Sequence, residues 1–441
     1  MNFDFGVVIL FVSLSILFSV LNRERFLNPA FVIFLFWIPA LVLSTASIRV
    51  DVDVYQYLNF TPSEGTFVLI SLALCCVSFG ALIASRLPIP ATPLDFVTIS
   101  DSRKLVVPST YVLGLFVFLY SYWNSGLLLA LCGSPAEIAF SRQQLHVRHF
   151  SLLIIFMDIS AIIITSRMLI TKKMWLIVPV VLPIFLYLIT LQKSRVIFLL
   201  LCMVFVALIL HRETRSFVFS SFSRVVVLAL TGIFLFSALY ATNVVRGVGV
   251  LDPDSPSAVC KSRSAQTAPM PSADPTSIFS GDAGGVGHVF VYIGAAAIRN
   301  FSSTVQGLVP ADQPTYGRLA VRTLLWPFVD RDTLNPTRHL GGINNGTALI
   351  YYWSDFRVPG IVAFSLIVGA MAQLAFRLAR RRTLIGLLLG AIAFSACAMS
   401  IFTDMFFEPL TAIQVAVSLV ISTLLAWLPR KGILSRQGDG E

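Results

Sequence analysis

Arginine is the residue type in this sequence that could do the most chemistry, because many arginines lie beside strongly apolar segments. A planar guanidinium group can bind two oxygens of a phosphate at once, which suits it to an anionic headgroup or a departing diphosphate. Arg195 begins one apolar segment and Arg246 follows another, so we favour an anion site over a simple membrane anchor for each. The arginines on this predicted outer side are Arg142, Arg148, Arg195, Arg246, Arg299, Arg318, Arg322, Arg331 and Arg338.

Two of these arginines have a spacing that allows two interpretations. Arg318 and Arg322 are four residues apart, so on a helix they would project from one face and could clamp an anion. Both side chains could equally extend to lipid headgroups. The sequence leaves these two interpretations open.

Histidines and acidic residues supply the candidates for proton transfer. His149 follows Arg148 and His339 follows Arg338, so either could assist proton transfer near a diphosphate, although each could also be a solvated loop residue. No pair of histidines has metal-ligand spacing, so we expect neither a metal nor a cofactor. The candidates for a general base are Glu137, Asp158, Asp330, Asp332, Asp404 and Glu408. Asp158 lies inside an apolar segment and should therefore be paired with another group.

The composition excludes a soluble protein. Of the 441 residues, 56% are hydrophobic and only 12% are charged, whereas soluble domains carry about 25% charged residues. The net charge of +10 does not indicate nucleic-acid binding, because most Lys and Arg residues occur in short runs between apolar segments. Such runs set the topology of a membrane protein.

The apolar segments predict an all-α, polytopic transmembrane helix bundle of about eleven spans. A span needs about 20 apolar residues. The predicted spans are 5–21, 30–46, 66–84, 106–122, 151–170, 174–191, 196–211, 225–243, 358–378, 384–401 and 409–428. Basic residues gather in alternate loops, which places the N-terminus outside and the C-terminus in the cytoplasm.

The predicted spans divide the chain into three regions. Residues 1–243 hold the first eight spans, with an external loop at 123–150, and residues 358–441 hold the last three spans and a cytoplasmic tail. Residues 244–357 form a large outer loop, with a flexible linker at 251–285 and a helical part at 286–357. Within that part, 289–306 and 316–328 have helical patterning with aromatic residues. A disulfide between Cys132 and Cys260, both in outer loops, is left open.

One stretch before the ninth predicted span resembles a known family signature. It consists of Asn345-Gly346-Thr347-Ala348-Leu349, then Trp353-Ser354-Asp355-Phe356, then Gly360. The stretch resembles the bacterial O-antigen polymerase and oligosaccharide repeat unit polymerase family. Gln192-Lys193-Ser194-Arg195 is similar to a Gly-Ser-Arg element of that family, and Tyr316-Gly317 also matches in kind.

The stretch also departs from the family pattern. Arg357 stands where the family usually has glycine, and Trp353 stands where it has tyrosine. A purely structural interpretation also fits, in which Ser354 or Asp355 caps the new helix and Pro359 lies in its first turn.

The resemblance implies a metal-independent glycosyltransferase of GT-C-like architecture in the bacterial inner membrane. Its substrates would be undecaprenyl-diphosphate-linked glycans at the periplasmic face, and its partners a chain-length co-polymerase and a repeat-unit flippase, with no nucleic acid. The expected catalytic residues are Arg195, Arg246, Arg338 and His339. The expected substrate-binding residues are Arg142, Arg148, Arg299, Tyr316, Arg318, Arg322, Asn345 and Asp355.

Other functions remain as alternatives at this point. An O-antigen ligase would have similar spans and the same leaving group but another acceptor. A lipid-linked oligosaccharide flippase or other transporter would usually show two related halves, whereas the loops of this chain are unequal. A purely structural membrane scaffold is the last alternative.

Overall fold

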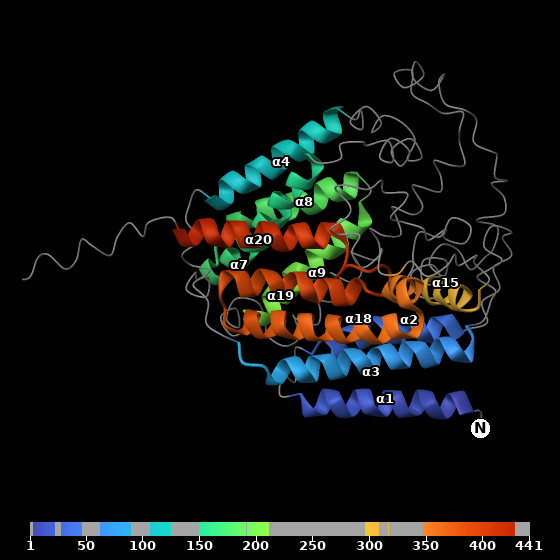
Figure 1. Ribbon diagram of the computed structural model, residues 1–441. Coiled ribbons are helices and arrows are strands. Elements are labelled where there is room, and N and C mark those ends of the chain that lie inside the picture. Colours follow the sequence, from blue (N-terminus) through green and yellow to red (C-terminus); the bar gives the residue numbers. More distant parts are fainter. Residues whose placement is uncertain are drawn as a thin grey trace, which may run out of the picture.

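The computed structural model describes residues 3–22, 28–45, 62–89, 106–124, 150–190, 192–210, 296–307, 316 and 347–427. The regular secondary structure in these ranges is helical, with no strand, which agrees with the predicted all-α class. The long helices lie side by side (Figure 1). They are α1 (Phe3–Leu21), α2 (Pro29–Thr45), α3 (Glu64–Arg86), α4 (Val106–Asn124), α7 (Ile155–Thr171), α8 (Ile177–Ile189), α9 (Lys193–Ile209), α18 (Ala348–Arg380), α19 (Leu384–Met399) and α20 (Pro409–Trp427). Two short 3-10 segments, Phe150–Ile154 and Met174–Leu176, precede α7 and α8, and the short helix α15 spans Ala296–Val305.

The apolar helices make this chain a membrane protein by length and composition. Five of the described helical stretches are long and apolar enough to cross a bilayer: Glu64–Arg86, Val106–Trp123, Leu152–Thr171, Ala348–Arg380 and Pro409–Ala426. The helices α1, α2, α8, α9 and α19 contain shorter apolar stretches. All ten coincide with predicted spans. The predicted span 225–243 lies outside the described residues.

The helices share two ends, which we call the Arg195 end and the Arg377 end. At the Arg377 end, Arg377 Nη1 donates to the carbonyls of Ala84 (2.6 Å) and Leu87 (2.7 Å), so α3 and α18 finish together. At the other end, the amide of Ala348 donates to the carbonyl of Ser400 (2.9 Å), so α18 begins where α19 finishes. Because α9 runs antiparallel to α19, with Phe198 bonded to Ser395 and Cys202 to Ala391, the first residues of α9 lie at this same end. Figure 1 shows the two helices side by side.

Small residues let neighbouring helices approach closely. A Cβ on Gly80 of α3 would collide with the Leu366 carbonyl of α18, and a Cβ on Gly369 of α18 would collide with the Val77 carbonyl of α3. Backbone contact of this kind is typical of helices that associate inside a bilayer, where no hydrophobic driving force brings helices together.

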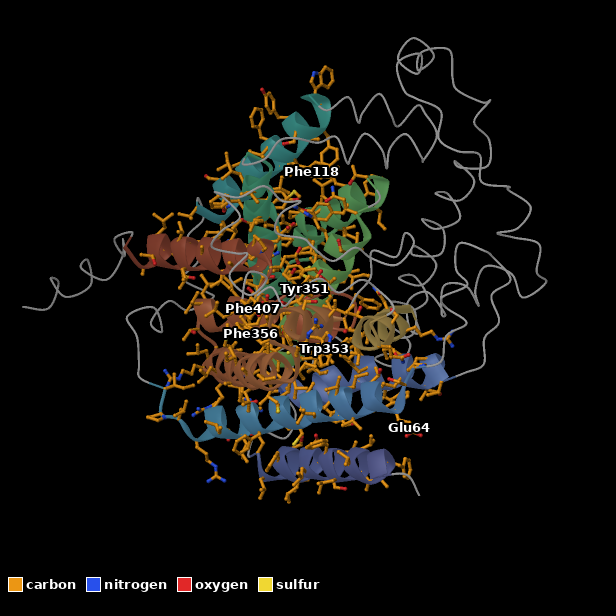
Figure 2. All side chains as sticks on the ribbon, turned by 45° about the vertical axis from the view of Figure 1, so that its right-hand side comes forward. Glu64, Phe118, Tyr351, Trp353, Phe356 and Phe407 are labelled. Atoms are coloured by element: carbon orange, nitrogen blue, oxygen red, sulfur yellow. The ribbon has the colours of Figure 1, made fainter. Side chains whose placement is uncertain are left out.

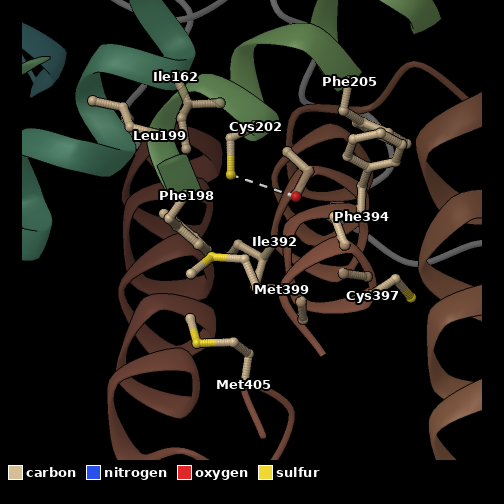
Figure 3. Close-up of a cluster of buried hydrophobic side chains, with 14 of the residues drawn as sticks. Ile162, Phe198, Leu199, Cys202, Phe205, Ile392, Phe394, Cys397, Met399 and Met405 are labelled. Atoms are coloured by element: carbon tan, nitrogen blue, oxygen red, sulfur yellow. Dashed lines mark hydrogen bonds between the residues drawn. The ribbon is translucent and has the colours of Figure 1, made fainter. Parts of the chain in front are cut away.

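An apolar core joins α9 to α19 (Figure 3). Phe205 packs against Phe394, with ring centroids 5.4 Å apart. The thiol of Cys202 donates to the Ala391 carbonyl (3.4 Å), and Ser395 Oγ donates to the Phe198 carbonyl (3.1 Å). Both bonds tie polar side chains of the core to the facing helix, so they fix the register of this antiparallel pair.

The start of α18 differs from the sequence prediction. We expected a helix near residue 358 capped by Ser354 or Asp355, but α18 begins at Ala348 with Thr347 at the N-cap position. Neither Ser354 nor Asp355 is therefore the N-cap of α18 as a whole. The helix is instead broken at Phe356 and Arg357, where Arg357 has φ 57° and ψ −135°. Pro359 does lie in the first turn after this break, where the missing amide hydrogen is tolerated. Only the part of α18 after the break is continuously apolar, so the sequence predicted the start of the span at residue 358 and not at Ala348.

Candidate functional site

The strongest candidate site is a cluster of three side chains, Asp158, Tyr187 and Arg195, at the Arg195 end. Tyr187 Oη donates to Asp158 Oδ1 at 2.5 Å. Arg195 Nη1 donates to Tyr187 Oη at 3.3 Å and lies 3.9 Å from Asp158 Oδ2. The exposed fraction is 3% for Asp158 and 0% for Tyr187. The Arg195 side chain is 20% exposed, so Arg195 is the member of the cluster that reaches the surface.

Helix ends place the three side chains together. Asp158 lies in the first turn of α7, Tyr187 in the last turn of α8 and Arg195 in the first turn of α9. The turn between α8 and α9 is tight, since the amide of Gln192 donates to the Tyr187 carbonyl at 2.8 Å. Phe118 of α4 packs its ring edge-on to Tyr187, with centroids 5.8 Å apart. The tyrosine hydroxyl is thereby held between the carboxylate and the guanidinium.

The cluster stabilises the buried carboxylate of Asp158. A carboxylate inside an apolar bundle is expensive unless it is paired and hydrogen-bonded, and Asp158 has both an arginine and a tyrosine. The expectation that Asp158 is paired is therefore confirmed. Only Nη1 of Arg195 takes part in these interactions, and its Nη2 and Nε groups form no hydrogen bond with another described residue.

A second buried cluster lies where α18 begins. Tyr352 Oη donates to Asp404 Oδ1 (3.3 Å), which also accepts from the amide of Phe407 (3.4 Å). The rings of Tyr352, Phe364 and Phe407 pack together, with centroids 5.1 to 6.1 Å apart. Phe356 packs against Phe364 at 6.2 Å, and Figure 2 shows Phe356 and Phe407 in this part of the bundle.

Two of the other site residues expected from the sequence are buried in the same half of the molecule. Asp355 is 1% exposed and is the last residue before the break in α18. Arg299 of α15 is 2% exposed, and its Nη2 donates to the Ser44 carbonyl (3.3 Å) at the C-terminus of α2. Burial lowers the pKa of the Arg299 guanidinium. Arg299 thus joins the outer helix α15 to the bundle.

The remaining expected residues are not brought to the cluster by the described structure. Tyr316 is 75% exposed. Arg142, Arg148, Arg246, Arg318, Arg322, Arg338, His339 and Asn345 lie outside the described residues. Among the residues that the structure describes, no three His, Cys, Asp or Glu side chains come together as a metal site would require.

Sequence reasoning missed the two tyrosines. Tyr187 and Tyr352 each connect a buried carboxylate to its surroundings, yet neither was a candidate. A tyrosine inside an apolar segment needs a partner for its hydroxyl, and Tyr187 is such a residue. Tyr111 and Tyr120 also lie inside an apolar segment, so this signal does not choose the partner of Asp158, and Tyr352 lies before the predicted span 358–378.

Comparison of the chain with protein-family models, with curated proteins and with solved structures found no match. Its function is therefore argued from its own residues.

Proposed function

We propose that this protein is a polymerase of undecaprenyl-diphosphate-linked oligosaccharide repeat units. It would transfer the growing glycan from its lipid diphosphate to a hydroxyl of an acceptor repeat unit at the periplasmic face of the inner membrane. The oxygen of the acceptor bonds to the anomeric carbon, the bond from that carbon to the diphosphate breaks, and a base takes the acceptor proton.

The observation that carries the proposal is the arrangement of Arg195. Asp158 and Tyr187 hold one side of its guanidinium group, so Nη2 and Nε are oriented and remain available to an anion. Preorganised donors are what stabilise charge that develops on a leaving group. Asp158 also neutralises much of the arginine charge, so a diphosphate would need further cations. The proposal assigns that task to Arg142, Arg148, Arg246 and Arg338.

Asp158 and Tyr187 act in this proposal as positioning residues. Both are buried, and Asp158 is already engaged by Tyr187 and Arg195, so Asp158 is a poor candidate for the base that takes the acceptor proton. Glu137, Asp330, Asp332, Asp404 and Glu408 remain as the candidates for that base.

The break in α18 is a second support, because it falls on the stretch that resembles the polymerase family. Arg357, where the family usually has glycine, has a positive φ that glycine adopts without strain. At Gly360, a Cβ would collide with the carbonyl of Tyr352 across the break. A glycine preference at both positions therefore has a structural reason in this backbone.

The direction of the helices supports the eleven-span topology. The helix α9 ends at the Arg377 end, whereas α18 begins at the Arg195 end, so the intervening chain has to pass from one end to the other. The predicted span 225–243 would supply this crossing. Among the described residues, the basic ones at the Arg195 end are Lys193, Arg195 and Arg299. Those at the Arg377 end are more numerous: Arg86, Arg167, Lys172, Lys173, Arg377, Arg380, Arg381 and Arg382. This distribution favours a periplasmic Arg195 end, a periplasmic N-terminus and a cytoplasmic C-terminus.

The test is to replace Arg195 and to follow polymer length in the native host. Arg195→Ala should abolish the ladder of long glycans, because loss of one preorganised donor lowers the rate by on the order of 10²–10³. Arg195→Lys should restore little, since lysine lacks the planar fork. Arg377→Ala is the matched control and should leave the ladder intact. A normal ladder from an Arg195→Ala protein present at wild-type level would refute the assignment.

Deletion of the gene separates the polymerase from the ligase. Loss of a polymerase leaves single repeats attached to the outer core, whereas loss of a ligase leaves the core bare. A flippase would instead be revealed by repeat units retained at the cytoplasmic face.

A further inference from the structure

Five arginines lie at the Arg377 end, where α3 and α18 finish. Arg86 is in the last turn of α3, and Arg377 and Arg380 are in the last turn of α18. Arg381 and Arg382 follow directly in the chain. We call these five residues the arginine patch.

Hydrogen bonds from α18 hold the two parts of the patch together. Arg377 Nη1 donates to the Leu87 carbonyl (2.7 Å), although the two residues are 290 positions apart in the sequence. Arg381 Nη2 donates to the Ile89 carbonyl. Both acceptors lie just after Arg86, so these bonds bring the end of α18 to Arg86. The patch is therefore a product of the fold and not a run of charges in one loop.

The arginine patch is accessible and strongly cationic. Its five side chains are exposed or partly exposed. Residues 73–89 and 369–383, which include these two helix ends, contain no Asp or Glu. The positive-inside bias explains the sign of these charges, but it does not require side chains from two distant segments to meet.

An exposed apolar stripe on α3 leads to the patch. Phe79, Ile83 and Leu87 follow each other at intervals of four residues, so they lie on one side of the helix, and they are 41%, 45% and 46% exposed. Arg86 lies on the same side, three residues after Ile83. The stripe rises about 12 Å along α3. A phospholipid has the same order of groups, since its charged headgroup is followed by an apolar chain.

The chemistry of the patch fits a phosphate. A planar guanidinium group can bind two phosphate oxygens at once, and several such groups at one place stabilise a bound anion. Under the proposed topology, the Arg377 end faces the cytoplasmic leaflet, whose anionic lipids attract basic residues. Each basic residue close to such lipids strengthens binding about fivefold.

We infer that the arginine patch binds an anionic phospholipid, with the lipid phosphate at the arginines and an acyl chain along the apolar stripe of α3. Arg377 and Arg381 hold the two segments together, and Arg86 and Arg380, both exposed, present guanidinium groups to the phosphate. This inference does not depend on the proposed polymerase activity.

Lipid titration of the full-length protein in maltoside micelles tests the site. Native mass spectrometry counts bound dioleoylphosphatidylglycerol or dioleoylphosphatidylcholine, which share their acyl chains and differ in net charge. The wild type should bind the first phosphatidylglycerol on the order of tenfold more tightly than phosphatidylcholine. Arg86→Gln should weaken that binding about fivefold, and the double variant Arg86→Gln with Arg380→Gln about 25-fold.

A second pair of basic residues at the same end provides the matched control. Lys172 and Lys173 lie in the turn between α7 and α8 and are exposed. The double variant Lys172→Gln with Lys173→Gln removes the same charge as the double arginine variant. It should weaken phosphatidylglycerol binding less than about twofold, since only charges close to the bound lipid contribute strongly.

The apolar stripe has its own test. Ile83→Gln leaves every charge in place but makes the stripe more polar, so it should weaken the binding of both lipids to a similar degree. The preference for phosphatidylglycerol should remain. Thermal unfolding of each variant in lipid-free micelles should match the wild type, because all the altered side chains are exposed.

Three results would each overturn the inference. Equal affinity of the wild type for the two lipids would show that the patch does not select an anion. Equal losses from the lysine and arginine double variants would show general attraction by charge without a site. If inorganic phosphate displaced phosphatidylglycerol better than sodium chloride of the same ionic strength, the ligand would be a free phosphate and not a lipid.

Discussion

Arg377 and Arg195, which lie at opposite ends of the bundle, make different kinds of contact. At the Arg377 end, Arg377 donates to the carbonyls of Ala84 and Leu87, and Arg381 Nη2 donates to the carbonyl of Ile89. These contacts satisfy carbonyls at the C-terminus of α3, where a cation is favoured by the helix dipole. At the Arg195 end, the arginine instead faces the side chains Asp158 and Tyr187.

The difference shows which arginine is structural and which is a candidate for function. Arg377 binds backbone at the end of a helix, and many sequences could provide such a cap. Arg195 is bound by an aspartate and a tyrosine from two other helices, and two of its nitrogens form no hydrogen bond with another described residue. An arrangement that requires three specific side chains is stronger evidence for a selected role than a helix cap.

The largest effect should come from Asp158→Asn. This change leaves the guanidinium of Arg195 without its counter-ion and should lower the free energy of unfolding by about 3 kcal/mol. Thermal unfolding in detergent micelles measures the loss. The double variant Asp158→Asn with Arg195→Gln should be more stable than the sum of the two single changes, since both charges are then gone. Simple additivity would show that the pair is not energetically coupled.

Tyr187→Phe should have the next largest effect. It removes the hydroxyl that bridges the carboxylate and the guanidinium but retains the ring that packs against Phe118. A hydrogen bond to a charged group contributes about 2 kcal/mol, so the same unfolding measurement should show a loss of that size. Tyr120→Phe, on the half-exposed side of α4, is the control. Equal stability of the Tyr187→Phe protein and the wild type would show that the bridge contributes nothing.

Arg377→Ala should be milder. Its hydrogen bonds to Ala84 and Leu87 are partly solvated, and cations at helix C-termini contribute about 1 kcal/mol or less. Arg377→Lys should retain most of that stability, because a point charge still complements the dipole. If Arg377→Ala destabilised the protein more than Asp158→Asn, the contrast between the two ends would be reversed.

The smallest effect concerns Arg357, which lies between the two ends. Its guanidinium lies over the Trp353 ring, 5.3 Å from the ring centre, which offsets part of the strain of its positive φ. Arg357→Gly removes both the contact and the strain, whereas Arg357→Ala removes the contact alone. The glycine variant should therefore be more stable than the alanine variant by about 1 kcal/mol. The reverse order in thermal unfolding would contradict a positive φ at Arg357.

The sequence predicted the apolar helices well because a bilayer imposes a simple rule on length and hydropathy. Within the described ranges, each predicted span has its helix, and the ends differ most at α18. There, the stretch from Ala348 to Asp355 is helical, but it is rich in polar and aromatic residues. A search for apolar segments by hydropathy therefore does not include it. The break at Phe356 depends on backbone angles that no window records.

Less of the candidate site could be predicted. The sequence indicated that Asp158 needs a partner and that Arg195 is a notable charge, but it did not pair them. Pairing depends on how α7, α8 and α9 pack, and contacts between helices leave no local pattern in a single sequence. Tyr187 has no feature of its own that separates it from other membrane tyrosines.

The close contact between α3 and α18 has a consequence for biogenesis. Gly80 of α3 lies against the backbone of α18, and Gly369 of α18 lies against the backbone of α3. The ribosome, however, synthesises α3 long before α18. During that interval, the face of α3 that carries Gly80 contacts acyl chains or another helix. Assembly of this membrane protein must therefore include a late step, in which α18 replaces lipid along α3, a helix inserted near the beginning.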